Sequence, residues 1–140
     1  MTAPWTAGEE PQVYPIARSG DLVHIRQAIR ALSQQCGLSL VDQTKIITAA
    51  SELARNALTY GGGGTVSAGL VRVDNKRGVA AVFEDSGPGI PDVDQAMTDG
   101  WTSGSGLGLG LSGARRLVDD FRLRTAPGEG TAVTIVKWVR

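Results

Sequence analysis

Apolar residues recur at helical spacing soon after the start of the chain. Their successive intervals are three, four and three residues, which predicts an amphipathic helix; they are Leu22, Ile25, Ile29 and Leu32. Asp21 or Ser19 is a candidate N-cap residue, and Gly37 fits the end of this helix.

A second stripe of apolar residues follows and predicts a second helix; its members are Ile46, Ala50, Leu53 and Ala57. We expect this helix to start near Ser39, because Asp42 three residues later resembles the second half of a capping box. Gly61 is expected to end it.

Stretches rich in β-branched residues predict strands in the rest of the chain. Five are expected, in two hairpins and one short leading strand: 13–17, 65–73, 79–84, 121–125 and 131–139. Residues 79–83 are apolar on both faces, which is typical of a central strand. A short helix is expected over Pro91 to Met97, and another helix where apolar spacing returns, at Leu107, Leu111, Ala114, Leu117 and Val118.

The order of elements predicts an α+β fold with two layers, in which helices cover one face of a mixed sheet. A chain of 140 residues is expected to form one domain. We place this domain at residues 13–140 and a loose N-terminal tail at residues 1–12, which mix Pro, Gly, Glu and Thr.

Charge and cysteine content exclude several classes of function. Fourteen Lys and Arg balance fourteen Asp and Glu, which argues against binding to nucleic acid through phosphates and against a polybasic membrane anchor. Cys36 is the single cysteine, so no internal disulfide can form. The sequence has no apolar run of about 18 residues. These features predict a cytoplasmic protein that does not enter a membrane.

Glycine is over-represented, with 19 residues, and the excess is clustered. Four glycines are consecutive, Gly61 to Gly64, and many others lie between Gly87 and Gly113. Glycine permits positive φ angles and close approach of another group to the backbone. The clusters therefore indicate places where the chain folds tightly or meets a ligand.

The second predicted helix carries a carboxylate and a carboxamide on one face, Glu52 and Asn56, four residues apart. The Asn56 oxygen is a hard ligand suited to Mg²⁺, and the Glu52 carboxylate can accept a proton from a hydroxyl group. Taken alone, the pair is also typical of an ordinary solvated helix face, and that interpretation is the more frequent one.

A second candidate segment directly follows the predicted central strand. Asp85 is costly to bury without a partner, and Gly87 and Gly89 would let the backbone approach a flat ligand. The carboxylate could then accept a hydrogen bond from an exocyclic amine such as that of adenine. A plain turn that ends the strand is an equally good interpretation of these turn-forming residues.

A third segment alternates glycine with other residues just before a predicted helix; its members are Gly104, Ser105, Gly106, Leu107, Gly108, Leu109 and Gly110. Backbone N–H groups at a helix N-terminus form a site for phosphate. The spacing matches neither the Rossmann fingerprint nor the Walker A loop. A mobile loop without a ligand is the alternative, although the regular leucines argue against it.

Together with a Gly-Thr pair at Gly130 and Thr131, these segments follow the order of the N, G1, G2 and G3 boxes. The chain therefore resembles the Bergerat-fold (GHKL) ATPases and kinases, and within them the RsbT-type serine/threonine kinases. The likeness extends over about residues 13–140, and includes Ala50 to Asn56, Gly87 to Asp92 and Lys137 to Arg140.

The resemblance implies a role for each matching residue. Glu52 would be the general base toward a substrate serine, and Asn56 would bind Mg²⁺ and through it ATP. Asp85 would accept from the adenine amino group, with help from Thr131. Gly87 and Gly89 would lie under the base, and residues 104–110 would form a lid over the phosphates.

The resemblance also implies partners. The substrate would be a small STAS-domain antagonist similar to RsbS and RsbR, and the released kinase would then activate a phosphatase or a sigma-factor regulator. The alternative is an anti-sigma or switch factor that binds ATP and acts by sequestering its partner. A DNA-topology or repair ATPase is disfavoured by the chain length.

Some residues receive no role from the sequence. The run from Gly61 to Gly64 is longer than expected for RsbT-type chains, and the lid has one additional Gly-Leu unit. Arg55 could touch phosphate or a partner, but a surface ion pair is the simpler expectation. His24 is not followed by an acidic residue, which argues against a histidine phosphoacceptor.

Overall fold

A computed structural model describes residues 5, 10–90, 97 and 109–140. Its elements, in chain order, are β1 (Gln12–Ile16), α1 (Ser19–Cys36), α2 (Leu40–Thr59), β2 (Gly64–Val73), β3 (Lys76–Asp85), α4 (Leu109–Leu117), β4 (Asp120–Thr125) and β5 (Thr131–Trp138). The five expected strands and three of the expected helices are confirmed. The helix expected over Pro91 to Met97 lies outside the described residues, apart from Met97, which is in a turn.

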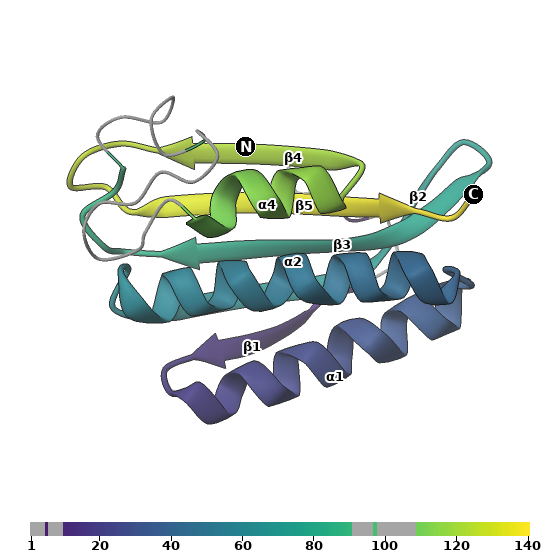
Figure 1. Cartoon of the computed structure of the whole chain (residues 1–140), viewed down its shortest axis with the longest axis horizontal. Helices are drawn as coiled ribbons and strands as arrows, with labels where there is room; N and C mark the ends of the chain where they lie inside the picture. Colours follow the sequence, from purple (N-terminus) through teal and green to yellow (C-terminus); the bar gives the residue numbers. More distant parts are fainter. Residues whose placement is uncertain (1–4, 6–9, 91–96, 98–108) are drawn as a thin grey trace.

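The strands form one five-stranded sheet in the order β1-β2-β3-β5-β4. Every pairing between neighbouring strands is antiparallel, so the expectation of a mixed sheet was wrong in this detail. Consecutive helices α1 and α2 lie side by side, and together they return the chain to the end of the sheet where β1 finishes (Figure 1). The next strand therefore runs opposite to β1, whereas a single crossover helix would have made the two strands parallel.

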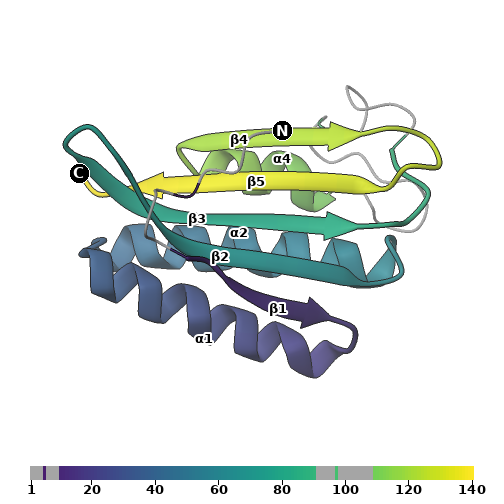
Figure 2. The same cartoon turned by 180° about the vertical axis from the view of Figure 1, so that it is seen from behind.

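Helices α1, α2 and α4 cover one face of the sheet, as Figure 1 and the reverse view in Figure 2 show. The core lies between these layers, and its largest fully buried side chains include Ile25, Ile29, Ile46, Val66 and Ile135. Both predicted helical stripes are confirmed: their members are buried, except Leu32, which is partly buried against the same core. This is the expected two-layer α+β fold.

The two long helices begin with different capping arrangements. Ser39 is the N-cap of α2, and its hydroxyl accepts a hydrogen bond from Asp42 N at 3.1 Å, as predicted. The N-cap of α1 is Arg18 and neither expected residue, because Ser19 is the first residue of the helix and Asp21 lies inside the first turn. The Asp21 carboxylate accepts hydrogen bonds from Ala17 N and Arg18 N. These backbone hydrogen bonds lower the pKa of Asp21.

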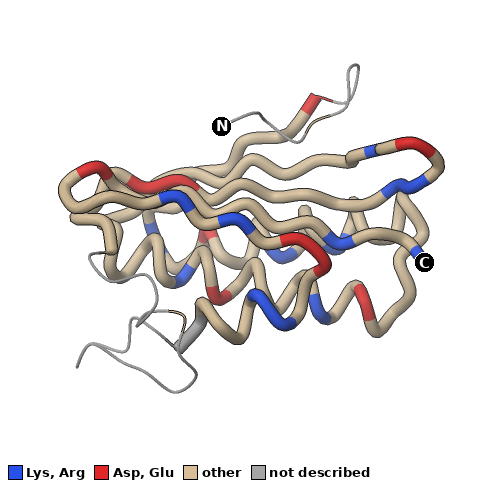
Figure 3. The backbone as a smooth tube through the Cα atoms, turned by 90° about the horizontal axis from the view of Figure 1, so that it is seen from above, with Lys and Arg blue, Asp and Glu red and all other residues tan. Residues whose placement is uncertain are grey.

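Charged residues of both signs are interspersed along the described chain (Figure 3). Among the described residues, no helix is both long enough and apolar enough to cross a membrane. Cys36 is buried at the end of α1, and burial raises the pKa of its thiol, which disfavours the reactive thiolate.

Candidate nucleotide site

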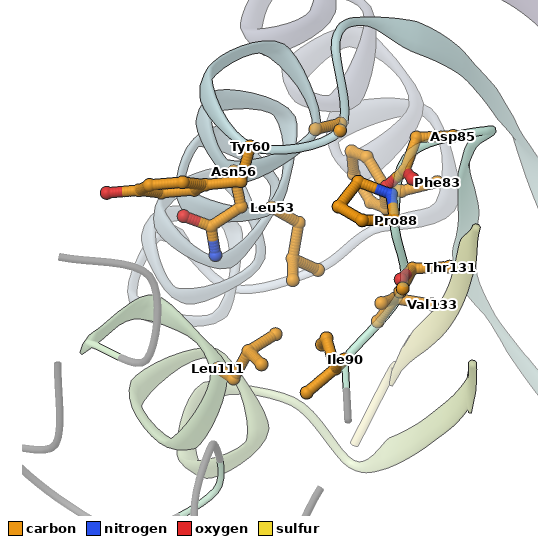
Figure 4. Close-up of a pocket in the computed structure, with 13 residues that line it drawn as sticks. Leu53, Asn56, Tyr60, Phe83, Asp85, Pro88, Ile90, Leu111, Thr131 and Val133 are labelled. Atoms are coloured by element: carbon orange, nitrogen blue, oxygen red, sulfur yellow. The ribbon is translucent and has the colours of Figure 1, made fainter. Parts of the chain in front are cut away.

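A pocket opens between α2, α4 and the ends of β3 and β5 (Figure 4). It encloses about 740 Å³ of space, including the solvent at its mouth, and it lies where the predicted site residues meet. Its lining residues are Leu53, Asn56, Ala57, Tyr60, Gly61, Phe83, Asp85, Pro88, Gly89, Ile90, Leu111, Thr131 and Val133. An apolar wall with a few convergent polar groups is typical of a small-molecule site.

Helix α2 supplies one polar group of this pocket, the carboxamide of Asn56. Its neighbours Leu53 and Ala57 are anchored in the core, which fixes the orientation of this helix face. Figure 4 shows the amide directed into the space between α2 and α4. The Asn56 Nδ2 atom is buried and has no hydrogen-bond partner among the described residues. Because an unpaired buried amide costs free energy, this position is suited to a polar ligand.

Glu52 lies one turn before Asn56 but does not line the pocket. Its Oε1 accepts a hydrogen bond from Arg55 Nη1 at 3.0 Å, and the two side chains are 39% and 55% exposed. The carboxylate therefore stands outside the pocket wall, accessible from solvent. The expectation that Arg55 forms a surface ion pair is confirmed, and its partner is the candidate base itself.

The carboxylate of Asp85 lies across the pocket from α2, at the end of the buried strand β3 (Figure 4). Asp85 Oδ1 accepts a hydrogen bond from Gly87 N at 2.9 Å, which holds the side chain in place. Asp85 pairs with Gly64 of β2 and with Thr131 of β5, so it has a strand on each side. The hydrogen bond from Gly87 N thus partly offsets the free-energy cost of burying the Asp85 carboxylate.

The floor of the pocket is a tight loop after β3. Gly89 has a φ of 78°, and a Cβ at this position would collide with the carbonyl oxygen of Ala126. Gly128 N donates to Pro88 O at 2.7 Å and ties this loop to the β4–β5 turn. The glycine at position 89 is therefore required both by backbone conformation and by the close approach of the turn.

Thr131 lines the pocket beside Asp85, as expected, and its hydroxyl lies 2.9 Å from Thr125 Oγ1. Thr125 Oγ1 accepts from Ile90 N at 2.9 Å and lies 3.0 Å from Gly130 O, to which it donates. The hydroxyl of Thr125 thus links the floor loop to β5. Sequence reasoning missed Thr125, because it precedes a turn and carries no motif of its own.

The aromatic residues of the pocket wall, Tyr60 and Phe83, were also missed by sequence reasoning. Phe83 belongs to the apolar run of the central strand, where it was interpreted only as core. Tyr60 is the C-cap of α2 and follows Asn56 by one turn, so its place on the same face was a signal that could have found it.

The expected lid falls largely outside the described residues, which omit positions 98–108 and therefore Gly104, Ser105, Gly106, Leu107 and Gly108. Leu109 and Gly110 form the first positions of α4. The next residue, Leu111, is buried and lines the pocket. The lid thus remains a prediction, with its C-terminal end next to the site.

The run of four glycines connects α2 to β2 beside the pocket. Gly62 and Gly63 have φ angles of 75° and 98°, which other residues rarely adopt. Gly63 N donates to Ala57 O at 2.8 Å and closes the C-terminal turn of the helix. A Cβ at Gly64 would collide with the backbone of Glu84 on the neighbouring strand. Part of the glycine excess therefore serves this connection.

The site can be tested for its fit to a bound magnesium nucleotide. Among the described residues, no group of three or more His, Cys, Asp or Glu gathers to hold a metal. A Mg²⁺ ion here would therefore be held by the Asn56 carboxamide together with phosphate oxygens of the nucleotide. The Asn56 Oδ1 atom would be the ligand of the ion, and the unpartnered Nδ2 atom, which can only donate, fits a phosphate oxygen of the nucleotide.

Comparison with known proteins agrees with the geometry. Residues 41–139 match the family described as "Histidine kinase-, DNA gyrase B-, and HSP90-like ATPase". The chain is 44% identical over 120 residues to the serine/threonine-protein kinase RsbT of Bacillus subtilis, covering 86% of this chain and 90% of that protein.

More distant relatives have a different named activity. The chain is 34% identical over 118 residues to the anti-sigma F factor of Pasteuria penetrans, covering 80% of this chain and 79% of the relative. A crystal structure of the RsbU and RsbW domains of a Mycobacterium tuberculosis protein matches the fold with a TM-score of 0.59 and 20% identity. That match covers 91% of this chain and 32% of the larger one.

Proposed function

This chain belongs to the histidine kinase-, DNA gyrase B- and HSP90-like ATPase family, and we propose that within it the chain is a protein serine/threonine kinase that uses Mg-ATP. The supporting observation is the placement of three groups around one pocket. Asn56 and Asp85 line it from different sides, and Glu52 stands one helical turn from Asn56 outside the wall. This arrangement separates nucleotide binding from contact with a protein substrate.

The nucleotide would enter with its base toward the end of β3. Asp85 can only accept hydrogen bonds when ionised, so it suits the 6-amino group of adenine and not the carbonyl oxygen of guanine. The floor loop at Gly87 and Gly89 would lie under the base, with Thr131 beside Asp85. The phosphates would then extend past Asn56 toward the lid at residues 104–110, whose N–H groups would bind them.

Transfer needs mainly positioning and neutralisation of charge. The serine oxygen of the substrate would attack the γ-phosphorus, the bond from that phosphorus to the β,γ-bridging oxygen would break, and ADP would leave. Glu52 would take the proton of the serine hydroxyl. A bound Mg²⁺ supplies positive charge near the transferred phosphoryl group. The exposed position of Glu52 suits a protein substrate, because a serine on another chain must reach its carboxylate.

The similarity to RsbT supports a substrate of the STAS-domain class, resembling RsbS and RsbR. Phosphorylation of that antagonist would release the kinase to bind a downstream phosphatase or sigma-factor regulator. We place this exchange of partners in the cytoplasm, where the lone Cys36 stays reduced.

A second candidate function is favoured by the named anti-sigma F relatives. In that case the chain would bind ATP and act mainly by sequestering its partner. The presence of both Glu52 and Asn56 favours the kinase, because sequestration alone needs no base on the exposed helix face.

The test has two steps. A STAS-domain partner is first captured from lysate with this chain as bait and purified. Phosphoryl transfer from γ-labelled ATP to that partner is then measured. We expect label on a serine or threonine of the partner and dissociation of the complex. Stable binding without transfer would favour the sequestering factor. Absence of nucleotide binding would remove both candidate functions.

A further inference from the structure

Gly61 contacts the carboxylate that is proposed to recognise the nucleotide base. It follows the C-cap of α2 and lines the same pocket as Asp85. A Cβ built on Gly61 would overlap Asp85 Cγ and would lie 2.7 Å from both Asp85 Cβ and Asp85 Oδ2. These distances are shorter than real Cβ contacts, so a side chain at position 61 requires a shift of Asp85 or of the backbone at position 61.

The requirement for glycine at position 61 is spatial and not conformational. Gly62 and Gly63 have positive φ angles, but Gly61 does not. Gly62 shows the opposite case, since its φ is 75° and a Cβ there would meet nothing within 4 Å. A substitution at Gly61 therefore introduces crowding without backbone strain, and a substitution at Gly62 introduces backbone strain without crowding.

Gly87 closes the other side of the same small space. A Cβ on Gly87 would lie 2.7 Å from Gly61 Cα and 3.1 Å from Asp85 Oδ1. The N–H of Gly87 donates to that Oδ1 atom at 2.9 Å. The carboxylate is thus packed between two glycines that lie 26 positions apart in the sequence. Oδ2, which the bond to Gly87 does not engage, is the oxygen that a side chain at position 61 would displace.

We propose that Gly61 is a specificity-determining positioning residue, which fixes the Asp85 carboxylate where it meets the 6-amino group of the purine. The inference rests on the proposed ATP-binding function and extends it to a residue outside the resembling motifs. Gly61 touches Asp85 and acts through it. Replacing Gly61 should therefore remove discrimination for the amino group, and not only weaken binding in general.

The experiment compares the affinity for Mg-ATP with that for Mg-purine riboside triphosphate, which lacks the 6-amino group. The wild-type protein should prefer ATP by about 10- to 100-fold, the value of a hydrogen bond to a charged group. Gly61→Ala should reduce this preference to less than about threefold, mainly by lowering the affinity for Mg-ATP. Gly62→Ala is the matched control, and it should lower the melting temperature while keeping the preference.

The outcomes separate this inference from the proposed function. If the wild-type protein binds neither nucleotide, the proposed function fails. If it prefers ATP and Gly61→Ala retains the full preference, only the role of Gly61 is overturned.

A second measurement applies even when Gly61→Ala is poorly folded. The melting temperature should fall on introducing Gly61→Ala into the wild type, but much less on introducing it into an Asp85→Gly background, because the overlapping atoms are gone. Equal falls in both backgrounds would contradict the contact between positions 61 and 85.

Discussion

Side chains on one face of α2 divide the proposed chemistry between them. Asn56 lies in the pocket with an unpartnered amide, whereas Glu52 lies outside it and pairs with the exposed Arg55. An exposed pair of this kind contributes at most about 1 kcal/mol to stability. The arrangement of Glu52 is therefore better explained by access to a substrate than by stabilisation of the fold.

Glu52→Gln tests this division directly. The amide keeps the size of the side chain but cannot accept a proton, so the rate of phosphoryl transfer should fall by about 100- to 10,000-fold. The affinity for Mg-ATP should stay within about twofold, because Glu52 does not line the pocket. Transfer at the wild-type rate would remove Glu52 as the base.

Single residues also show where sequence reasoning stops. Asp85, Gly89 and Thr131, which line the pocket, were singled out in the sequence because they belong to motifs with a fixed order. Thr125 and Gly61 were missed, since their importance comes from contacts with residues distant in sequence. Such contacts exist only once the strands are paired, so no local pattern indicates them.

At the scale of elements, α2 is the part of the chain that joins fold and site. Its buried stripe packs on the sheet, and its adjacent face carries Glu52 and Asn56. Apolar spacing and the Ser39 cap were sufficient to predict this helix. The sequence did not predict the direction of β2. Whether two strands run parallel depends on how many helices lie between them and how these helices pack.

Ser39→Ala tests the predicted cap of α2. Loss of the hydrogen bond from Asp42 N should lower the free energy of unfolding by about 1 kcal/mol. Urea unfolding measures the change. The affinity for Mg-ATP should not change, because the cap lies at the opposite end of the helix from Asn56. An unchanged midpoint would show that the cap contributes nothing.

At the scale of the whole molecule, a cluster of charges ties the C-terminus to α2. The side chain of Lys137 is 4% exposed, and its Nζ atom lies 3.5 Å from Asp42 Oδ1 and 3.3 Å from Asp119 Oδ1. Asp119 also accepts from Trp138 N and from Arg140 Nη2, at 2.7 and 2.6 Å. The sequence predicted β5 as a strand, but it did not predict that the Lys137 side chain is directed toward Asp42 of α2.

The pH dependence of stability should report on this cluster. Burial acts to raise the pKa of Asp119, but hydrogen bonds from Trp138 and Lys137 and the nearby positive charges outweigh it and lower the pKa. A lowered pKa in the folded state stabilises the protein above the ordinary carboxyl range, and this contribution is lost as the pH falls through the folded pKa.

Asp119→Asn should therefore lower the free energy of unfolding at pH 7 by about 1–3 kcal/mol and flatten its decline toward pH 3. Denaturant unfolding at several pH values measures both effects, and Asp74→Asn in the exposed turn between β2 and β3 is the control for net charge. An identical decline in wild type and Asp119→Asn would mean that Asp119 does not contribute to the acid sensitivity.

The central claim is that the pocket between α2, β3 and β5 binds Mg-ATP through Asp85. Isothermal titration calorimetry of wild type and Asp85→Ala tests it most directly. We predict saturable binding of Mg-ATP by the wild type and an affinity at least about tenfold lower for Asp85→Ala. Absence of binding by the wild type, or equal affinities, would contradict the account.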